Sequence, residues 1–214
     1  MRIFAIGDIH GCAEALEKLL GRLPVDWGAD LVIFLGDYID RGPEPRRVIE
    51  KVMELRKLYP ERVIALRGNH EWMFLRYLRG IEPEVFLFNG GEATLRAYYR
   101  EGKLDIPEEH RTFLEGLPLY YETEDYFFVH AGVRPERPLH NQEEEDLLWI
   151  REGFYYYPGT FPKKIVFGHT PFPEPLLLPD RLGIDTGCVY GGKLTAIELP
   201  AEKIYQVECP RRWP

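Results

Sequence analysis

The sequence is short of cysteine and of long apolar runs. Its three cysteines, Cys12, Cys188 and Cys209, match neither a zinc motif nor an even set of disulfides, so we expect them to be unpaired, in a reducing cytoplasm. No apolar run approaches the ~20 residues of a membrane-spanning helix, and the first residues lack the apolar core and cleavage site of a signal peptide. We therefore expect no membrane partner.

The chain also lacks an excess of positive charge. Its 27 Lys and Arg are outnumbered by 35 Asp and Glu, which gives a formal net charge of −8. A general nucleic-acid binder is expected to be basic, because contacts to phosphates supply most of its affinity. We therefore expect no nucleic-acid partner. The 214 residues, 45% of them hydrophobic, suffice for one compact core, and we expect a single domain over 1–214.

Three successive units near the start of the chain combine a short apolar strand, a polar loop and a helix. The strands are predicted at 2–6, 31–35 and 62–66, and the loops after them read GDIHG, GDYIDRG and RGNHE. Pro43 and Pro45 suit the first turn of the second helix. Repeated units of this kind predict a mainly parallel sheet with helices outside it. Ligands bind such sheets at the carboxyl ends of the strands, where all three loops fall.

The rest of the chain has a different pattern. Residues 81–117 are predicted to form a helical insertion beside the site. Most of 133–163 is predicted to be loop, with one helix near 143–150. Further strands are expected at 119–121, 126–129 and 165–167, followed by an antiparallel sheet of four strands at 175–178, 182–184, 194–199 and 203–207. The expected fold class is α/β (α+β).

Five predicted strand ends carry polar side chains of the kinds that bind metal ions. Each has a simpler explanation when taken alone, since Asp-x-His can cap a helix and a histidine at a strand end is most often an ordinary polar residue. Five such ends at one edge of a sheet are hard to explain in that way. The side chains are Asp8, His10, Asp37, Asp40, Arg41, Arg67, Asn69, His70, His130 and His169.

This donor set predicts a site for two metal ions. Carboxylate, imidazole and amide groups without cysteine suit Mn²⁺, Fe or Zn²⁺. Two divalent ions ~3.5–4 Å apart can share one carboxylate, and water bound to them ionises near neutral pH.

The loops carry a resemblance to a known family. GDIHG, GDYIDRG, RGNHE, HAGV and FGHTP, in this order, resemble the PPP-type metallophosphoesterases. That family includes serine/threonine protein phosphatases, their bacterial and phage relatives, and symmetrical diadenosine tetraphosphatases. NGGEATL (89–95) and DTGCVYGGKL (185–194) resemble the bacterial branch. The resemblance implies a calcineurin-like fold, with a central β-sandwich flanked by helices, and two divalent ions, with Mn²⁺ as first choice and Fe or Zn²⁺ as alternatives.

The resemblance also implies which residues bind the metals and the substrate. Asp37 matches the ligand shared by both ions. The full set of matching metal ligands is Asp8, His10, Asp37, Asn69, His130 and His169. Arg41 and Arg67 match groups that bind phosphate oxygens through paired hydrogen bonds. Trp149-Ile150-Arg151 resembles, more loosely, a segment that supplies a further phosphate-binding arginine, and Arg151 as an ordinary surface residue is the equal alternative.

Two further residues match the groups that move a proton. His70 matches the proton donor to the leaving oxygen, and Asp40 the carboxylate that orients it. We expect Asp40 to favour the cationic form of His70, because an opposite charge nearby stabilises that form.

The predicted reaction is hydrolysis of a phosphomonoester by direct attack of a hydroxide shared between the metals. Asp40 and RGNHE favour a serine/threonine phosphoprotein phosphatase, because in diadenosine tetraphosphatases the position of Asp40 is usually not acidic. The alternative is a symmetrical diadenosine tetraphosphatase or another nucleotide phosphohydrolase. The partner is therefore a phosphoprotein or a small phosphoester. The charge and the Asp40–His70 pair disfavour a nuclease, and the complete ligand set disfavours a non-catalytic binding module.

Overall fold

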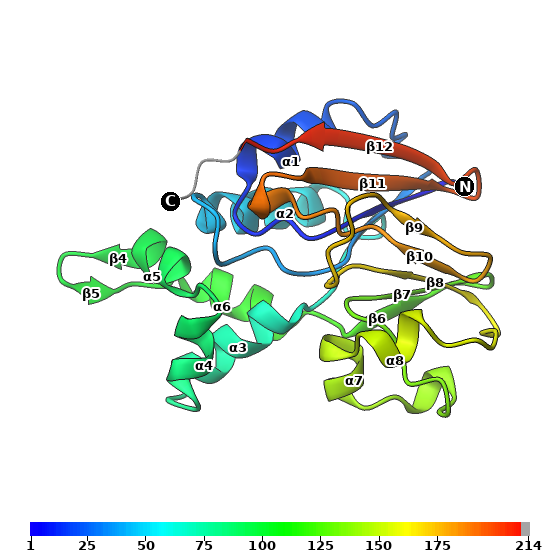
Figure 1. The fold of residues 1–214 in the computed structure, drawn as a ribbon. Helices are drawn as coiled ribbons and strands as arrows, with labels where there is room; N and C mark the ends of the chain where they lie inside the picture. The colour runs from blue at the N-terminus through cyan, green and yellow to red at the C-terminus, as the bar shows by residue number, and fades with distance from the viewer. Residues whose placement is uncertain (211–214) are drawn as a thin grey trace.

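Two five-stranded sheets form the centre of the molecule (Figure 1). The computed structural model describes residues 1–210, so the last four residues of the predicted domain, 211–214, lie outside it. The first sheet has the strand order β12-β11-β1-β2-β3 and the second β6-β7-β8-β10-β9. Apolar residues of both sheets, among them Ile33 and Val166, share one buried cluster. The sheets therefore pack face to face, as the predicted β-sandwich requires.

The first sheet contains the three parallel strands that the sequence predicts. They are β1 (Ile3–Ile6), β2 (Leu31–Phe34) and β3 (Val63–Ala65), with Ala5 opposite Ile33 and Ile33 opposite Ile64. All residues of β1 and β2 are buried, as in a sheet covered on both faces. Strands β11 (Lys193–Leu199) and β12 (Lys203–Glu208) extend the sheet in antiparallel fashion beside β1.

The second sheet corrects the prediction for the end of the chain. It consists of β6 (Tyr120–Glu122), β7 (Tyr126–Val129), β8 (Lys164–Phe167), β9 (Leu176–Leu177) and β10 (Arg181–Gly183). β10 runs parallel to β8, and β8 parallel to β7. The four predicted strands at the end of the chain therefore do not form one antiparallel sheet but divide between the two sheets. A local pattern marks a strand but not its partner, which depends on which faces become buried.

Helices cover the outer faces of both sheets. α1 (Ala13–Leu20), α2 (Pro45–Leu58) and α3 (Asn69–Leu78) share a buried apolar cluster with the first sheet, in which Leu16 and Val48 accompany Phe34. The short helices α7 (Glu144–Trp149) and α8 (Glu152–Tyr155) contribute Leu147 and Phe154 to a cluster with the second sheet. The layers therefore run helix, sheet, sheet, helix. α8 and a 3₁₀ turn at Leu139–Asn141 lie in a segment that was predicted to be loop.

The predicted insertion at 81–117 is largely helical, with one addition. It contains α4 (Pro83–Phe88), α5 (Glu92–Tyr98) and α6 (Glu108–Glu115). Between α5 and α6 a hairpin of β4 (Tyr99–Arg100) and β5 (Lys103–Leu104) projects at the left of Figure 1. The hairpin was not predicted, because its strands are only two residues long and carry no alternating pattern.

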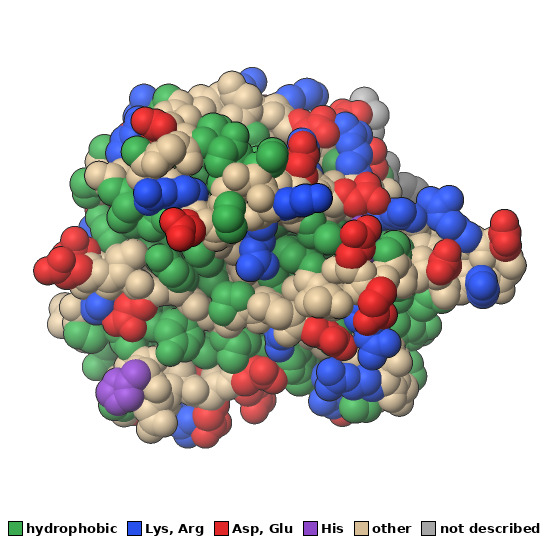
Figure 2. Space-filling view, turned by 180° about the vertical axis from the view of Figure 1, so that it is seen from behind, with side chains coloured by type: hydrophobic (Ala, Val, Ile, Leu, Met, Phe, Trp, Pro, Cys, Tyr) green, Lys and Arg blue, Asp and Glu red, His purple; other side chains and the backbone are tan. Residues whose placement is uncertain are grey.

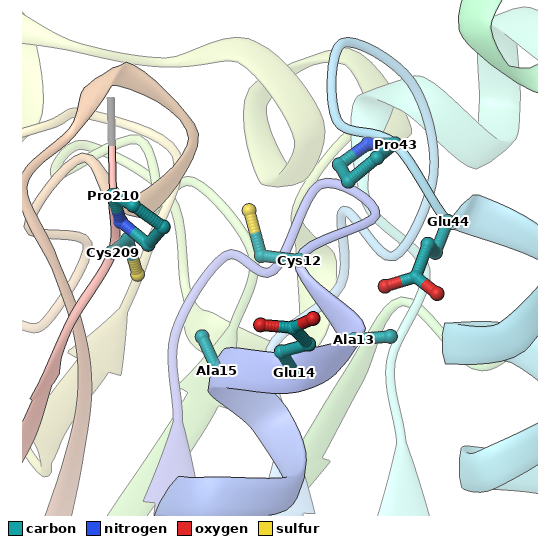
Figure 3. Close-up of a pocket in the computed structure, with 8 residues that line it drawn as sticks. All are labelled: Cys12, Ala13, Glu14, Ala15, Pro43, Glu44, Cys209 and Pro210. Atoms are coloured by element: carbon teal, nitrogen blue, oxygen red, sulfur yellow. The ribbon is translucent and has the colours of Figure 1, made fainter. Parts of the chain in front are cut away.

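The cysteines overturn the expectation that they stay unpaired. Cys188 and Cys209 form a disulfide that closes a separation of 21 residues, which removes the reason for expecting a reducing compartment. Cys12 keeps a free thiol. Figure 3 shows Cys12 and Cys209 lining one pocket together with Glu44. Burial raises the pKa of Cys12 to about 12, so its thiol stays protonated and is a poor nucleophile toward the disulfide.

Two further features of the molecule bear on its partners. Among residues 1–210, every helix is too short or too polar to cross a membrane. Figure 2 shows one face of the molecule, on which acidic and basic side chains are interspersed rather than gathered by sign.

Candidate metal centre

Most of the predicted ligands follow the carboxyl ends of strands in both sheets. Asp8 and His10 come after β1, Asp37 after β2, and His130 and His169 after β7 and β8. Asn69 begins α3, shortly after β3. Each of these six side chains lies in a residue that is at most 5% exposed. The sandwich therefore brings ligands more than 160 residues apart in the sequence to one buried place, where the backbone N–H of His169 donates to Asp8 at 3.1 Å.

Asp37 lies at the centre of this group. Its Oδ2 is 3.4 Å from His10 Nε2, and its Oδ1 is 3.5 Å from His130 Nε2. Two sets of ligand atoms lie within 4.8 Å of one another, namely His10 with Asp37 and His70, and Asp37 with His130 and His169. Since Asp37 belongs to both sets, it is placed to be shared between two ions.

The backbone orients two of the histidines for ligation. Nδ1 of His10 is 2.8 Å from the carbonyl oxygen of Ile39, and Nδ1 of His130 is 2.9 Å from that of Leu35. A carbonyl oxygen only accepts, so each Nδ1 carries the hydrogen. Burial lowers the pKa of both imidazoles, that of His130 to about 4, so both are neutral at neutral pH. Each Nε2 therefore presents a lone pair to the centre, as a metal ligand must.

The contacts around Asn69 fit a cation. Asn69 Oδ1 lies 2.8 Å from His130 Nε2 and 3.1 Å from His169 Nδ1. His130 Nε2 and Asn69 Oδ1 are both acceptors, and two lone pairs facing each other at this distance repel unless a positive charge lies close to both. Hard and borderline donors of this kind suit Mn²⁺, Fe or Zn²⁺. The residues present therefore fit a divalent metal ion.

Three buried carboxylates reinforce this fit. Burial raises the pKa of Asp8 and of Asp185, and raises that of Asp37 to about 7, and the three groups also repel one another. Asp185 was quoted in the sequence only as part of DTGCVYGGKL and was not predicted as a site residue. It follows β10 closely, so it is one more polar residue at a strand end, and that signal could have identified it.

The raised pKa values lead to a testable expectation for the metal-free protein. Its carboxyls hold protons that the unfolded chain has already released, so the free energy of unfolding falls as the pH rises through about 7. Histidines oppose this trend only near and below their ordinary pKa of about 6.5. In a chelator, the urea midpoint should therefore be lower at pH 8.5 than at pH 7. Excess Mn²⁺ should abolish the decrease, and an equal or higher midpoint at pH 8.5 in the chelator would contradict the assignment.

The backbone of the centre adopts an uncommon conformation. Five site residues have positive φ, namely His10 (45°), Asp37 (54°), Asp40 (69°), Arg41 (64°) and His169 (64°). Such angles cost free energy in residues other than glycine and persist only where surrounding contacts enforce them. The loops therefore need strong local support.

Glu71 supplies part of this support. Its carboxylate accepts the backbone N–H groups of Asp37, Tyr38 and Gly68, each at 2.9 Å. Asp37 also accepts the N–H of His70 at 3.1 Å. A Cβ on Gly68 would overlap with Asp37 Oδ1, so glycine is required there. Glu71 was not predicted as a site residue, because a glutamate in the first turn of a helix is common without a special role.

His70 and Asp40 form the predicted pair. His70 Nδ1 and Asp40 Oδ2 are 2.6 Å apart, and Asp40 Oδ1 accepts the hydroxyl of Thr94 at 2.5 Å. The expectation of a cationic His70 is wrong for the metal-free protein, since burial lowers the pKa of His70 and raises that of Asp40. That expectation took account of the negative charge of Asp40 but not of the free-energy cost of removing the His70 and Asp40 side chains from water. Thr94 lies in the segment NGGEATL and was not predicted as a site residue.

The three predicted arginines take different positions. Arg41 Nη1 donates to His10 Nε2 at 2.8 Å. Arg151 Nη1 donates to the carbonyl oxygen of His169 at 3.4 Å, and the ring of Trp149 lies 6.1 Å from that of His169. Arg151 is thus both exposed and beside the centre. Arg67 instead donates to the carbonyl oxygen of Glu115 at 2.7 Å, at the rim.

Comparisons with known proteins agree with this geometry. The family model of calcineurin-like phosphoesterases matches residues 1–208. A bis(5'-nucleosyl)-tetraphosphatase PrpE, described as asymmetrical, from Bacillus cereus is 31% identical over 97% of this chain and 94% of its own length. A solved structure of an inferred diadenosine tetraphosphatase has a TM-score of 0.78 and 26% identity, covering 98% of this chain and 94% of the other. A protein serine/threonine phosphatase from Saccharomyces cerevisiae shares the fold, with a TM-score of 0.70 and 17% identity over 100% of this chain and 81% of the other.

Proposed function

Since this chain belongs to the calcineurin-like phosphoesterase family and is a phosphohydrolase, we propose that its substrate is a bis(5'-nucleosyl) tetraphosphate. The observation that carries the choice of substrate is the 31% identity to an asymmetrical tetraphosphatase over 97% of this chain. This choice reverses the preference drawn from the sequence, where a phosphoprotein came first. It falls within the alternative given there, a symmetrical diadenosine tetraphosphatase or another nucleotide phosphohydrolase, but the relative is described as asymmetrical rather than symmetrical.

Six residues of the centre would hold two divalent ions in this proposal. His10 and Asp8 serve the first ion, Asn69, His130 and His169 the second, and Asp37 both. Mn²⁺ is the first metal to test, with Fe and Zn²⁺ as the comparison. When bound, the ions polarise the phosphoryl group and lower the pKa of the attacking water. The hydrogen bonds to Ile39 and Leu35 would leave Nε2 of His10 and of His130 to bind the ions, and on metal binding Arg41 would turn from His10 Nε2 to the phosphate.

The cationic side chains position the substrate. Arg41 and Arg151, which flank His10 and His169, can each donate two hydrogen bonds to oxygens of the phosphate being cleaved. Burial of the centre strengthens these charge-assisted bonds as negative charge develops. Arg67 lies farther out, beside Glu115, and is available to a later phosphate of the substrate.

His70 supplies a proton to the departing oxygen. Its Nδ1 faces Asp40, so its other ring nitrogen is directed toward Asp37, at 3.9 Å from Oδ2. Asp40 is in turn fixed by Thr94, which accepts its backbone N–H at 3.0 Å and donates to its side chain. This chain of contacts holds the imidazole in one orientation and tautomer, as a general acid requires.

A phosphoprotein is the second candidate, and the Asp40–His70 pair favours it. An alkoxide released from phosphoserine or phosphothreonine needs a proton. A nucleotide leaving through a phosphate oxygen needs one far less, because its pKa lies near neutrality. A centre with an intact proton donor is therefore able to act on both kinds of substrate.

Steady-state kinetics can decide between the two substrates. We expect kcat/KM of the Mn²⁺-loaded enzyme to be higher for diadenosine tetraphosphate than for phosphoserine, phosphothreonine or phosphotyrosine peptides. Chromatography should show two unequal nucleotide products rather than two equal ones. A hundredfold preference for a phosphopeptide, or about 2.7 kcal/mol of transition-state binding, would instead support the second candidate.

A further inference from the structure

Tyr190 is an exposed aromatic residue in a firmly held loop. It ends the 3₁₀ turn η2 (Cys188–Tyr190), which lies between Gly187 and Gly191, both with positive φ of 70° and 85°. The N–H of Gly187 donates to Asp185 at 2.9 Å, and Cys188 is joined to Cys209 by the disulfide. Although its backbone is fixed in this way, Tyr190 remains 56% exposed. A large ring held at a set place and open to solvent is available to a ligand.

The ring lies beside a residue that binds phosphate in the proposed function. The guanidinium carbon of Arg41 is 5.5 Å from the centre of the Tyr190 ring. Burial raises the pKa of the Tyr190 phenol, the positive charge of Arg41 opposes this shift, and the carboxylates of Asp185, Asp37 and Asp8 add to it. Tyr190 lies beside the metal centre, because Arg41, which contacts its ring, also donates to His10 Nε2 at 2.8 Å. A phosphate held by Arg41 would therefore bring its neighbouring groups close to this ring.

Arg41 also lines a hollow with room for such groups. A hollow of about 360 Å³ is lined by Arg41, Gly42, Pro43, Ala93, Arg96 and Ala97. Its proline and alanine side chains are apolar, and the side chain of Arg96 is 75% exposed. The volume falls in the range of small-molecule sites, ~300–1,000 Å³. Arg41 thus borders both an aromatic face and an open, partly apolar hollow.

We propose that Tyr190 is a stacking platform for a nucleobase of the substrate whose phosphates lie on Arg41. The ring face of tyrosine stacks on any base, and Arg41 holds the adjoining phosphate, so together they select a nucleotide over a bare phosphate chain. The inference rests on the proposed function, because only a nucleotide substrate has a base to stack. The phosphoserine side chain itself carries no aromatic ring.

Binding measurements separate the base from the phosphates. The ligands are the β,γ-methylene analogue of ATP, which carries a base, and methylenediphosphonate, which does not. Calorimetry with the Mn²⁺-loaded protein should give a Kd about tenfold lower for the nucleotide analogue. Tyr190→Ala should raise the Kd of the nucleotide about tenfold and change that of the diphosphonate less than twofold. Tyr190→Phe keeps the ring and should retain the nucleotide affinity.

A second tyrosine provides the matched control. Tyr99 is also exposed but lies in the hairpin of the insertion, so Tyr99→Ala should leave both Kd values unchanged. Equal affinity of Tyr190→Ala and the wild type for the nucleotide would overturn the inference, as would equal affinity of the wild type for both ligands. Thermal melting checks that each variant is folded.

The turnover of diadenosine tetraphosphate distinguishes this inference from the proposed function. A wild type that binds the nucleotide through Tyr190 but does not cleave the tetraphosphate would overturn the proposed function alone. A wild type that cleaves it with a KM unaffected by Tyr190→Ala would overturn the stacking role alone.

Discussion

Asp37→Asn is expected to lower kcat/KM about a thousandfold, or about 4 kcal/mol of transition-state stabilisation. Asp37 is the carboxylate that belongs to both sets of ligand atoms, so its replacement should weaken the binding of both metal ions at once. Asparagine keeps the size of the side chain and tolerates the positive φ of 54° at this position. It can also still accept the N–H of His70. The loss should therefore come from the missing negative charge rather than from a distorted loop.

Metal content and stability identify the cause of that loss. The variant should bind fewer than two Mn²⁺ per chain by atomic absorption, and Mn²⁺ should no longer raise its melting temperature. The metal-free variant should melt no lower than the wild type, because burial already raises the pKa of Asp37 to about 7 and disfavours its charge. Asp125→Asn, at an exposed position, is the matched control. Two bound ions together with wild-type activity would refute the shared-ligand role.

His70→Asn is expected to lower kcat about 10²–10⁴-fold on a phosphoserine peptide, the range typical of a lost general acid. On p-nitrophenyl phosphate the loss should be about tenfold or less, because nitrophenolate leaves without a proton. Diadenosine tetraphosphate should resemble p-nitrophenyl phosphate, since its leaving oxygen belongs to a phosphate. The dependence on the leaving group distinguishes proton donation from a general disturbance of the site.

The metal content of this variant must be measured as well, because His70 lies within reach of Asp37. We expect two bound ions, since His70 is not one of the six proposed ligands, although its Nε2 lies 3.9 Å from Asp37 Oδ2. His140→Asn, in an exposed 3₁₀ turn, serves as the control. Equal losses on all three substrates, or loss of an ion, would argue that His70 holds metal rather than a proton.

The sequence predicted the parts of the fold that local pattern determines. The strands before Asp8, Asp37 and Asn69 are short buried runs followed by glycine, and both features are visible in the letters alone. The division of the last strands between two sheets was not predictable in this way, because β10 and β11 differ in partner rather than in pattern. The Cys188–Cys209 disulfide depends on the same long-range arrangement.

The same distinction applies to the site. The residues predicted to bind metal or to move a proton lie together in the fold, whereas Glu71 and Thr94, which support them, were quoted within RGNHE and NGGEATL but given no role. Thr94 contacts Asp40 across 54 residues, and Glu71 contacts the backbone of Asp37 across 34, so the partner of each residue cannot be read from its own motif. The protonation of His70 was misjudged for a related reason, since burial is a property of the folded chain.

The contacts of Glu71 have a consequence for how such an enzyme can change its substrate. The carboxylate of Glu71 joins the loop after β2 to the start of α3 by hydrogen bonds. The proposed ligands on these two segments, Asp37 and Asn69, are therefore held in a fixed relative position. The groups at the rim are built separately: Glu115 stands on the insertion, and Tyr190 on a loop closed by its own disulfide. If the proposed roles hold, chemistry and selectivity reside in different segments of the chain. A rim segment can be exchanged for one of another length or charge while the reaction at the centre stays the same.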